Sequence, residues 1–276
     1  MTATAGEAGA TTFFHREGDT YVPTGHARGP WDDTQLHGGA PAALLVREIE
    51  RTDPGAADLA VARLTYEFLG PVPMAPLTVR AEVVKPGRRF QLVEGEIAVA
   101  GGPVVVRVRA VRLRRGEVAV PDGARGSGPD GIPGGPDPQQ ARREVLEPYG
   151  AAAEGFHLTG MELRFVSGSF HETGPAVTWF RPRFPLVDDE PASPLARVAM
   201  AADFGNGISR VLDFRTHLFI NTDLMIAVHR EPQGEYVLLD TRTAIDPRGT
   251  GLAESRLHDE AGSLGISAQT LFVDER

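Results

Sequence analysis

The stretch NTDLMIAVHR, residues 221–230, alternates like a half-buried β-strand, yet it begins with three polar residues, Asn221, Thr222 and Asp223. Consecutive strand residues point to opposite faces of a sheet, so exposure of one face cannot account for all three. An asparagine amide offers one acceptor and two donor hydrogens, which suits it to orient a water molecule or a carboxylate. Because it cannot be a nucleophile, Asn221 is a candidate for a site at which water attacks.

A second candidate group begins the helix predicted for HGGAPAALLVREIERT, which starts at His37. The first N–H groups of a helix lack intrahelical partners, and the helix dipole favours negative charge there. Gly38 and Gly39 would let a ligand approach those groups without a Cβ in the way. They are therefore candidates to stabilise an oxyanion. His37 either takes part in this site or only forms a hydrogen bond at the start of the helix.

Other chemistries find no support in the sequence. The chain has no cysteine, which excludes a disulfide framework, a thiolate zinc site and a cysteine nucleophile. Its eight histidines are scattered without metal-ligand spacing, and no glycine-rich phosphate loop follows a strand. The stretches GSGPDG and VSGSFH lack the strand–turn–helix context of a serine nucleophile elbow. We therefore expect no metal site and no cofactor.

The overall composition is that of a soluble globular protein, with 41% hydrophobic and 24% charged residues. The net charge of −9 argues against nucleic acid and anionic membrane surfaces as partners. The first twelve residues lack the pattern of a signal peptide, and no apolar stretch approaches the roughly 18 residues that cross a bilayer. We expect a cytoplasmic protein without membrane insertion.

The chain divides into two halves around one segment of unusual composition. Residues Gly116–Pro138 are dense in Gly, Pro and Asp and have few groups to bury, as in an exposed linker. We predict an N-terminal unit at residues 12–115, a linker at 116–150, and a C-terminal unit at 151–276.

The two halves share a pattern at a constant offset of 160 residues. Glu94 corresponds to Glu254 and the turn at Gly102 to the turn at Gly262 (254 − 94 = 262 − 102 = 160). In each half one helical segment precedes the strands, and Ser193 followed by a proline is typical of a helix start. The pattern predicts an α+β fold in which each half packs one helix on an antiparallel sheet. The two sheets could join edge to edge and so hide two exposed edges.

Four stretches, LHGGAPAALL, AADFGNG, INTDLMIAVHREP and GISAQTLFVDER, resemble the acyl-CoA thioesterase II family, a double hotdog fold. The resemblance implies that Asp203 is the base of a hydrolytic site. It also implies that Asn221, where threonine often stands, and Gln269 hold the attacking water. The base and the oxyanion site would come from opposite halves, so that Gly39 N–H faces Asp203.

The same resemblance implies an acyl-CoA or acyl-carrier substrate and assembly into a homo-oligomer. At the offset of 160, Asp203, Asn221 and Gln269 correspond to Ala43, Val61 and Arg109. The first half therefore lacks the three polar groups, and we expect one hydrolytic site per chain.

Each candidate also has an ordinary structural explanation. Asp203 precedes Phe-Gly-Asn-Gly and could open a turn, Asn221 could begin a strand, and Gln269 could face solvent. Two other functions stay open: a hotdog dehydratase or hydratase, which would need a histidine beside the acid, and a non-catalytic acyl-binding protein. A fold hosts many functions, so geometry must distinguish them.

Overall fold

The computed structural model describes residues 11–53, 55, 58–121, 136–147 and 153–276. The first half forms a short hairpin, one long helix and four long strands. Their bounds are β1 Phe14–Glu17, β2 Thr20–Pro23, a 3-10 turn η1 Gly25–Ala27, α1 Gly39–Arg51, β3 Leu59–Phe68, β4 Leu77–Lys85, β5 Phe90–Val99 and β6 Val104–Arg114.

The second half repeats this order with additions. Its elements are β7 Arg142–Glu144, a π-helical turn η3 Phe156–Gly160, β8 Met161–Ser167, β9 Ala176–Pro182, α2 Pro194–Ala202, α3 Gly205–Ile208, β10 His217–Asn221, β11 Asp223–Val228, β12 Val237–Asp246, β13 Thr250–Asp259 and β14 Gly262–Glu275. The predicted cap of α2 is confirmed, since the Ser193 hydroxyl accepts a hydrogen bond from Ala196 N–H and a proline follows it.

The described strands form one antiparallel sheet of fourteen strands, ordered β1-β2-β4-β5-β6-β3-β11-β14-β13-β12-β9-β8-β7, with β10 paired to β14. The strand order is symmetric about the middle of the sheet. There β3 pairs with β11, and β6 and β14 flank this pair, followed by β5 and β13. The predicted edge-to-edge joining of the two halves is therefore present, and it removes two free edges.

Strand register tests the 160-residue offset. At the centre of the sheet Thr65 pairs with Met225, which lies 160 residues later (225 − 65 = 160). On the last strand the offset falls to 159: Glu94 pairs with Arg109, whereas Glu254 pairs with Ala268 (268 − 109 = 159). The hairpin between β13 and β14 is therefore one residue shorter than the hairpin between β5 and β6.

The expected correspondence between Gln269 and Arg109 is therefore wrong by one position. Gln269 corresponds to Ala110, which is fully buried, as Gln269 is. Arg109 instead points outward and forms an ion pair with Glu94. The first half therefore has an apolar residue, Ala110, at the position where the second half has the Gln269 amide.

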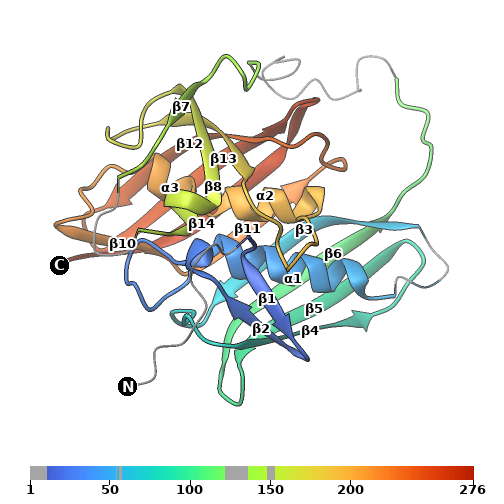
Figure 1. The fold of residues 1–276 in the computed structure, drawn as a ribbon. Coiled ribbons are helices and arrows are strands. Elements are labelled where there is room, and N and C mark those ends of the chain that lie inside the picture. Colours follow the sequence, from blue (N-terminus) through green and yellow to red (C-terminus); the bar gives the residue numbers. More distant parts are fainter. Residues whose placement is uncertain (1–10, 54, 56–57, 122–135, 148–152) are drawn as a thin grey trace.

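The two helices α1 and α2 lie side by side against the sheet (Figure 1). Ten of the thirteen residues of α1 are buried, as the apolar sequence of this helix predicts. Among the described residues, every helix is too short or too polar to cross a membrane.

Two segments differ from the sequence interpretation. The strand expected over residues 221–230 is interrupted at Thr222, which separates β10 from β11, and β11 ends at Val228. Here the Asp223 carboxylate, and not a backbone carbonyl, accepts the hydrogen bond of Thr270 N–H at 2.6 Å. Residues 122–135 and 148–150 of the predicted linker lie outside the described residues. The described part of the linker includes β7, which pairs with β8.

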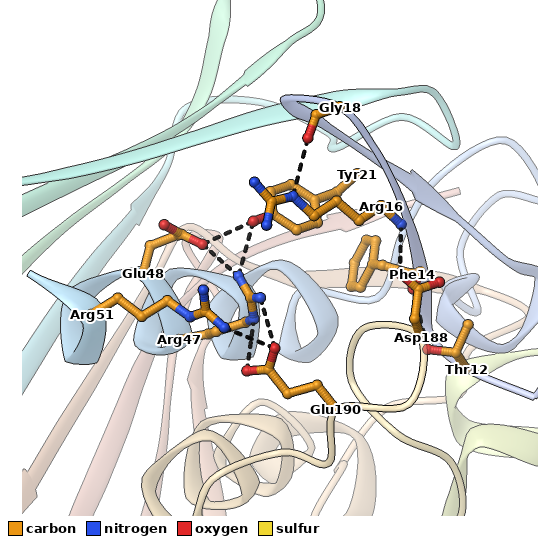
Figure 2. Close-up of polar contacts among 10 residues, drawn as sticks. All are labelled: Thr12, Phe14, Arg16, Gly18, Tyr21, Arg47, Glu48, Arg51, Asp188 and Glu190. Carbon is orange, nitrogen blue, oxygen red and sulfur yellow. Dashed lines mark hydrogen bonds and ion pairs between the residues drawn. The ribbon is translucent and has the colours of Figure 1, made fainter.

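A buried arginine ties α1 to the segment before α2 (Figure 2). Arg47 is 6% exposed and donates two hydrogen bonds to Glu190, at 3.0 and 2.7 Å. It also donates to the Tyr21 hydroxyl and the Glu48 carboxylate, at 2.9 and 2.6 Å. Arg51 adds a bond to Glu190 at 2.9 Å. These bonds fix the two helices relative to each other.

Removing the Glu190 charge is expected to destabilise the fold in a pH-dependent way. Hydrogen bonds from Arg47 are the main cause that lowers the pKa of Glu190. Its contribution is therefore complete above the unfolded-state pKa, about 4.3, and is lost as pH falls through the lower folded-state value. Because Glu190 is partly exposed, we expect Glu190→Gln to lower the free energy of unfolding at pH 7 by only about 1 kcal/mol.

Urea unfolding at pH 7 and pH 3 measures this effect, with Glu82→Gln on the exposed face of β4 as the control. A Glu190→Gln deficit of equal size at both pH values would contradict the assignment.

Candidate active site

Asp203 ends α2 and is 4% exposed. Its carboxylate has partners from three different elements. Asn221 at the end of β10 donates its amide N–H to Oδ1 at 2.9 Å, and Gln269 on β14 lies 3.4 Å from the same oxygen. His37 Nδ1, just before α1, lies 2.8 Å from Oδ2. Residues distant in sequence thus converge on one buried carboxylate.

Gln269 is itself fixed by its surroundings. It is 1% exposed, its Nε2 donates to the Asp203 carbonyl at 3.3 Å, and its Oε1 accepts the backbone N–H of Asn206 at 3.0 Å. Gly205 leaves room for this contact, because a Cβ there would lie 2.7 Å from Gln269 Oε1. Asn206 is held in turn by a bond to the Phe219 carbonyl at 3.0 Å. The amide therefore has a defined orientation towards Asp203.

His37 belongs to this cluster through its side chain. Its ring is 9% exposed and packs against Phe156 and Phe204, with ring centroids 4.7 and 4.6 Å away. Gly39 N–H points at Nδ1 from 3.2 Å, and Asp203 Oδ2 approaches the same nitrogen.

One nitrogen cannot serve both partners in the same state. If Nδ1 carries a proton it donates to Asp203, and Gly39 N–H then has no acceptor there. If Nδ1 is unprotonated it accepts from Gly39, and its lone pair then faces an ionised carboxylate. An ionised Asp203 therefore favours the Nδ1–H tautomer, which leaves Gly39 N–H available to another acceptor.

The two glycines lie at the junction of α1 and α2. A Cβ at Gly38 would lie 2.9 Å from Asp203 Oδ2, and a Cβ at Gly39 would lie 2.7 Å from the Met200 carbonyl oxygen. The first turn of α1 therefore abuts the last turn of α2. The partly positive end of α1 lies next to the carboxylate.

A cavity of about 350 Å³ opens beside this cluster. Its polar wall includes His37, Asp203 and Asn221, and most of the remaining wall is apolar. The tryptophan and phenylalanine side chains that line it are Trp31, Phe68, Phe170, Phe204, Phe214 and Phe272. Such a cavity combines apolar volume with a few convergent polar groups, as ligand sites generally do.

His157, in the turn η3, also lines the cavity and was not singled out in the sequence. It is 6% exposed, and burial, followed by the nearby charge of His37, lowers the pKa of His157 to about 3. At neutral pH it therefore presents a neutral ring.

The structure brings together the six candidate residues, His37, Gly38, Gly39, Asp203, Asn221 and Gln269. Sequence reasoning gave no role to Asn206, although it lies within the quoted stretch AADFGNG, and none to the aromatic residues of the cavity. No periodicity marks those rings, because they come from separate loops and from two different strands, with Phe68 at the end of β3 and Phe272 on β14. Among the described residues no three His, Cys, Asp or Glu side chains cluster as they would around a metal ion.

The neutral state of His157 can be tested directly by ¹⁵N NMR of its imidazole ring between pH 8 and pH 5. The ring shifts are expected to stay those of a neutral imidazole, since the pKa lies near 3. A model peptide histidine, with a pKa of about 6.5, titrates over this range. A midpoint near 6.5 for His157 would show that its ring is not desolvated as described.

Comparison with family models gives two matches. Residues 27–113 match the model of the acyl-CoA thioesterase N-terminal domain, and residues 129–273 match that of the acyl-CoA thioesterase C-terminal domain. A comparison with curated proteins gives no match.

Several solved structures share the fold. A proposed thioesterase II from Thermobifida fusca YX has a TM-score of 0.71 at 19% identity, with 96% of each chain covered. A hot dog fold protein of unknown function from Alicyclobacillus acidocaldarius scores 0.68 at 17% identity, also with 96% of each chain covered. An acyl-CoA thioesterase II from Mycobacterium marinum scores 0.60 at 17% identity, covering 94% of this chain and 93% of that one. The fold is thus of the hotdog type, and the chain belongs to the acyl-CoA thioesterase family.

Proposed function

We propose that this protein hydrolyses an acyl thioester to a free acid and a thiol, with Asp203 as the general base for water attack. One observation carries the proposal: the Asp203 carboxylate, at the wall of an apolar cavity, is held by Asn221, Gln269 and His37 beside the first turn of α1. A carboxylate fixed in this way can bind a water molecule and accept its proton.

The reaction balances with these groups alone. Water gives a proton to Asp203 while its oxygen bonds to the thioester carbonyl carbon. The resulting tetrahedral intermediate carries the negative charge on the former carbonyl oxygen. Its collapse breaks the carbon–sulfur bond, and the departing sulfur takes up the proton. Asp203 is thereby restored to its ionised form.

The developing oxyanion needs hydrogen-bond donors placed in advance. Gly39 N–H is available when His37 donates its Nδ1 proton to Asp203, and the first turn of α1 adds its dipole. His37 therefore couples the two tasks, because the tautomer that pairs with the ionised base also frees the oxyanion donor.

The substrate is proposed to be an acyl-CoA or acyl-carrier thioester. The apolar cavity would take the acyl group. A second cavity of about 360 Å³ shares Trp31, His157 and Phe170 with it, and its charged lining residues are Arg215, Arg276, Asp32, Asp33 and Glu154. This second cavity is more polar and suits the remainder of the thiol component.

We further propose a double hotdog with units at residues 12–115 and 151–276 and one hydrolytic site. The register supports a single site, because Ala110 stands where Gln269 stands in the second half. Val61 and Ala43 likewise stand opposite Asn221 and Asp203 at the 160-residue offset. Assembly into a homo-oligomer stays a prediction of the resemblance.

A second candidate function gains support from His37. A hotdog dehydratase or hydratase would need a histidine beside the acid, and no histidine lies next to Asp203 in the sequence. In the structure His37 lies 2.8 Å from Asp203, so an acid and a histidine do meet. Hydrolysis remains the better proposal because both amides, Asn221 and Gln269, also converge on the carboxylate.

The central substitution is Asp203→Asn, which keeps the shape and removes the base. We expect the rate of thiol release from an acyl-CoA to fall by about 10²–10⁴-fold. The control is Asp223→Asn, which retains an acceptor oxygen for Thr270 N–H and does not line the cavity. Equal rates in wild type and Asp203→Asn, with both proteins folded, would refute the assignment of the base.

The two functions differ in their products. Wild type is expected to release thiol from saturated acyl-CoAs across a chain-length panel and to leave enoyl-CoA absorbance unchanged. Hydration of an enoyl-CoA without thiol release, abolished by His37→Gln, would establish the second candidate instead.

A further inference from the structure

A hollow of about 650 Å³ lies where β8 and β9 lead into the segment before α2, far along the sheet from its centre. It is lined by five arginines, Arg143, Arg164, Arg181, Arg183 and Arg197, and only two carboxylates, Glu162 and Glu235. The chain as a whole carries a net charge of −9, whereas the residues that line this hollow have an excess of three positive charges (5 − 2 = 3).

Both carboxylates that line the hollow form ion pairs with its arginines. Glu162 accepts hydrogen bonds from Arg164 and Arg181, both at 2.6 Å, and Glu235 pairs with Arg181 at 3.1 Å. Strand pairing produces this arrangement, since Glu162 stands directly opposite Arg181 and Arg164 opposite Arg143. Of the five arginines, Arg164 and Arg181 are the two that form ion pairs with these carboxylates.

Among the described residues the other three arginines form no ion pair with a carboxylate, although the charge of Glu162 acts on Arg183 and those of Glu235 and Glu260 act on Arg197. Arg197 donates only to the carbonyls of Ala192 and Gly234, at 2.8 and 2.6 Å. Burial, and then the positive charges of Arg143 and Arg181, lower the pKa of Arg183, and burial lowers the pKa of Arg197. Arg143 and Arg183 are exposed and Arg197 is half-buried. Guanidinium groups gathered at one hollow repel one another, and an anion bound between them would offset that repulsion.

The hollow is separate from the thioester cavity. Phe184, at its edge, contacts Phe13, with ring centroids 6.2 Å apart. Phe13 contacts Phe156 at 5.3 Å, and Phe156 contacts His37 at 4.7 Å. A wall of aromatic rings therefore lies between the hollow and the catalytic cluster.

We propose that this arginine-lined hollow is a binding site for an organic diphosphate, with Arg143, Arg183 and Arg197 as its ligands. Planar guanidinium groups bind phosphate oxygens in pairs, and three charges suit a diphosphate better than a carboxylate. Phe184 and the prolines at 182, 185 and 191 also line the hollow, and the organic part can pack against these apolar side chains.

Isothermal titration with inorganic pyrophosphate tests the site without reference to catalysis. Wild type is expected to bind it, and Arg143→Gln/Arg183→Gln is expected to bind at least about tenfold more weakly. The affinity of wild type should also fall with added salt more steeply than that of the variant. Arg183→Lys, which keeps the charge but not the paired geometry, should be intermediate.

The matched control is Arg80→Gln/Arg248→Gln, which removes the same charge from two side chains that are 78% and 89% exposed elsewhere. It is expected to bind pyrophosphate like wild type. Absence of binding by wild type, or equal weakening in both double variants with unchanged melting temperatures, would overturn the proposal.

The source of the diphosphate is a separate question that rests on the proposed function. If the hollow takes the nucleotide end of the substrate, Arg143→Gln/Arg183→Gln raises the KM for an acyl-CoA but not for the matching acyl-pantetheine. If it takes a separate ligand, both KM values stay unchanged. Each result keeps the site, because only the titration tests its existence.

Discussion

The close approach of α1 to α2 is the constraint on which the candidate site depends. A Cβ at Gly39 would lie 2.7 Å from the Met200 carbonyl, and one at Gly38 would lie 2.9 Å from the Asp203 carboxylate. Only residues without a side chain allow the start of one helix to reach the end of the other. This contact places a helix dipole, the Gly39 N–H and a carboxylate within one small volume.

The sheet and the polar ties hold that contact in place. Pairing of β3 with β11 joins the two halves into one sheet, so the helices they support cannot move independently. Arg47 adds a buried connection from α1 to Glu190, just before α2. The break at Thr222, stabilised by Asp223, ends β10 at Asn221, whose amide reaches Asp203. The polar start of this strand, unusual in the sequence, therefore has a local structural cause as well as a proposed catalytic one.

Much of the fold was predictable because it depends on local patterns. The cap at Ser193, the buried α1 and the repeated strands follow from capping, burial and alternation. The register of the last strand was not predictable, because the β13–β14 hairpin is one residue shorter than the β5–β6 hairpin and the residue pattern does not show this difference. The constant offset therefore matched Gln269 to Arg109, whereas the strand register matches it to Ala110. The resemblance to the family predicted that one site contains Asp203, Asn221 and Gln269. The contact of His37 with Asp203 depends on helix packing over 166 residues (203 − 37 = 166), which spacing alone does not reveal.

The most direct test of the proposed mechanism is a single turnover of an acyl-CoA in H₂¹⁸O with enzyme in excess. If Asp203 activates water, the fatty acid from that first turnover carries ¹⁸O and the Asp203 peptide keeps its unlabelled mass. If Asp203 instead attacks the thioester and forms an anhydride, hydrolysed by water at the Asp203 carboxyl, the first acid is unlabelled. The label then appears in the Asp203 peptide, which would contradict water attack.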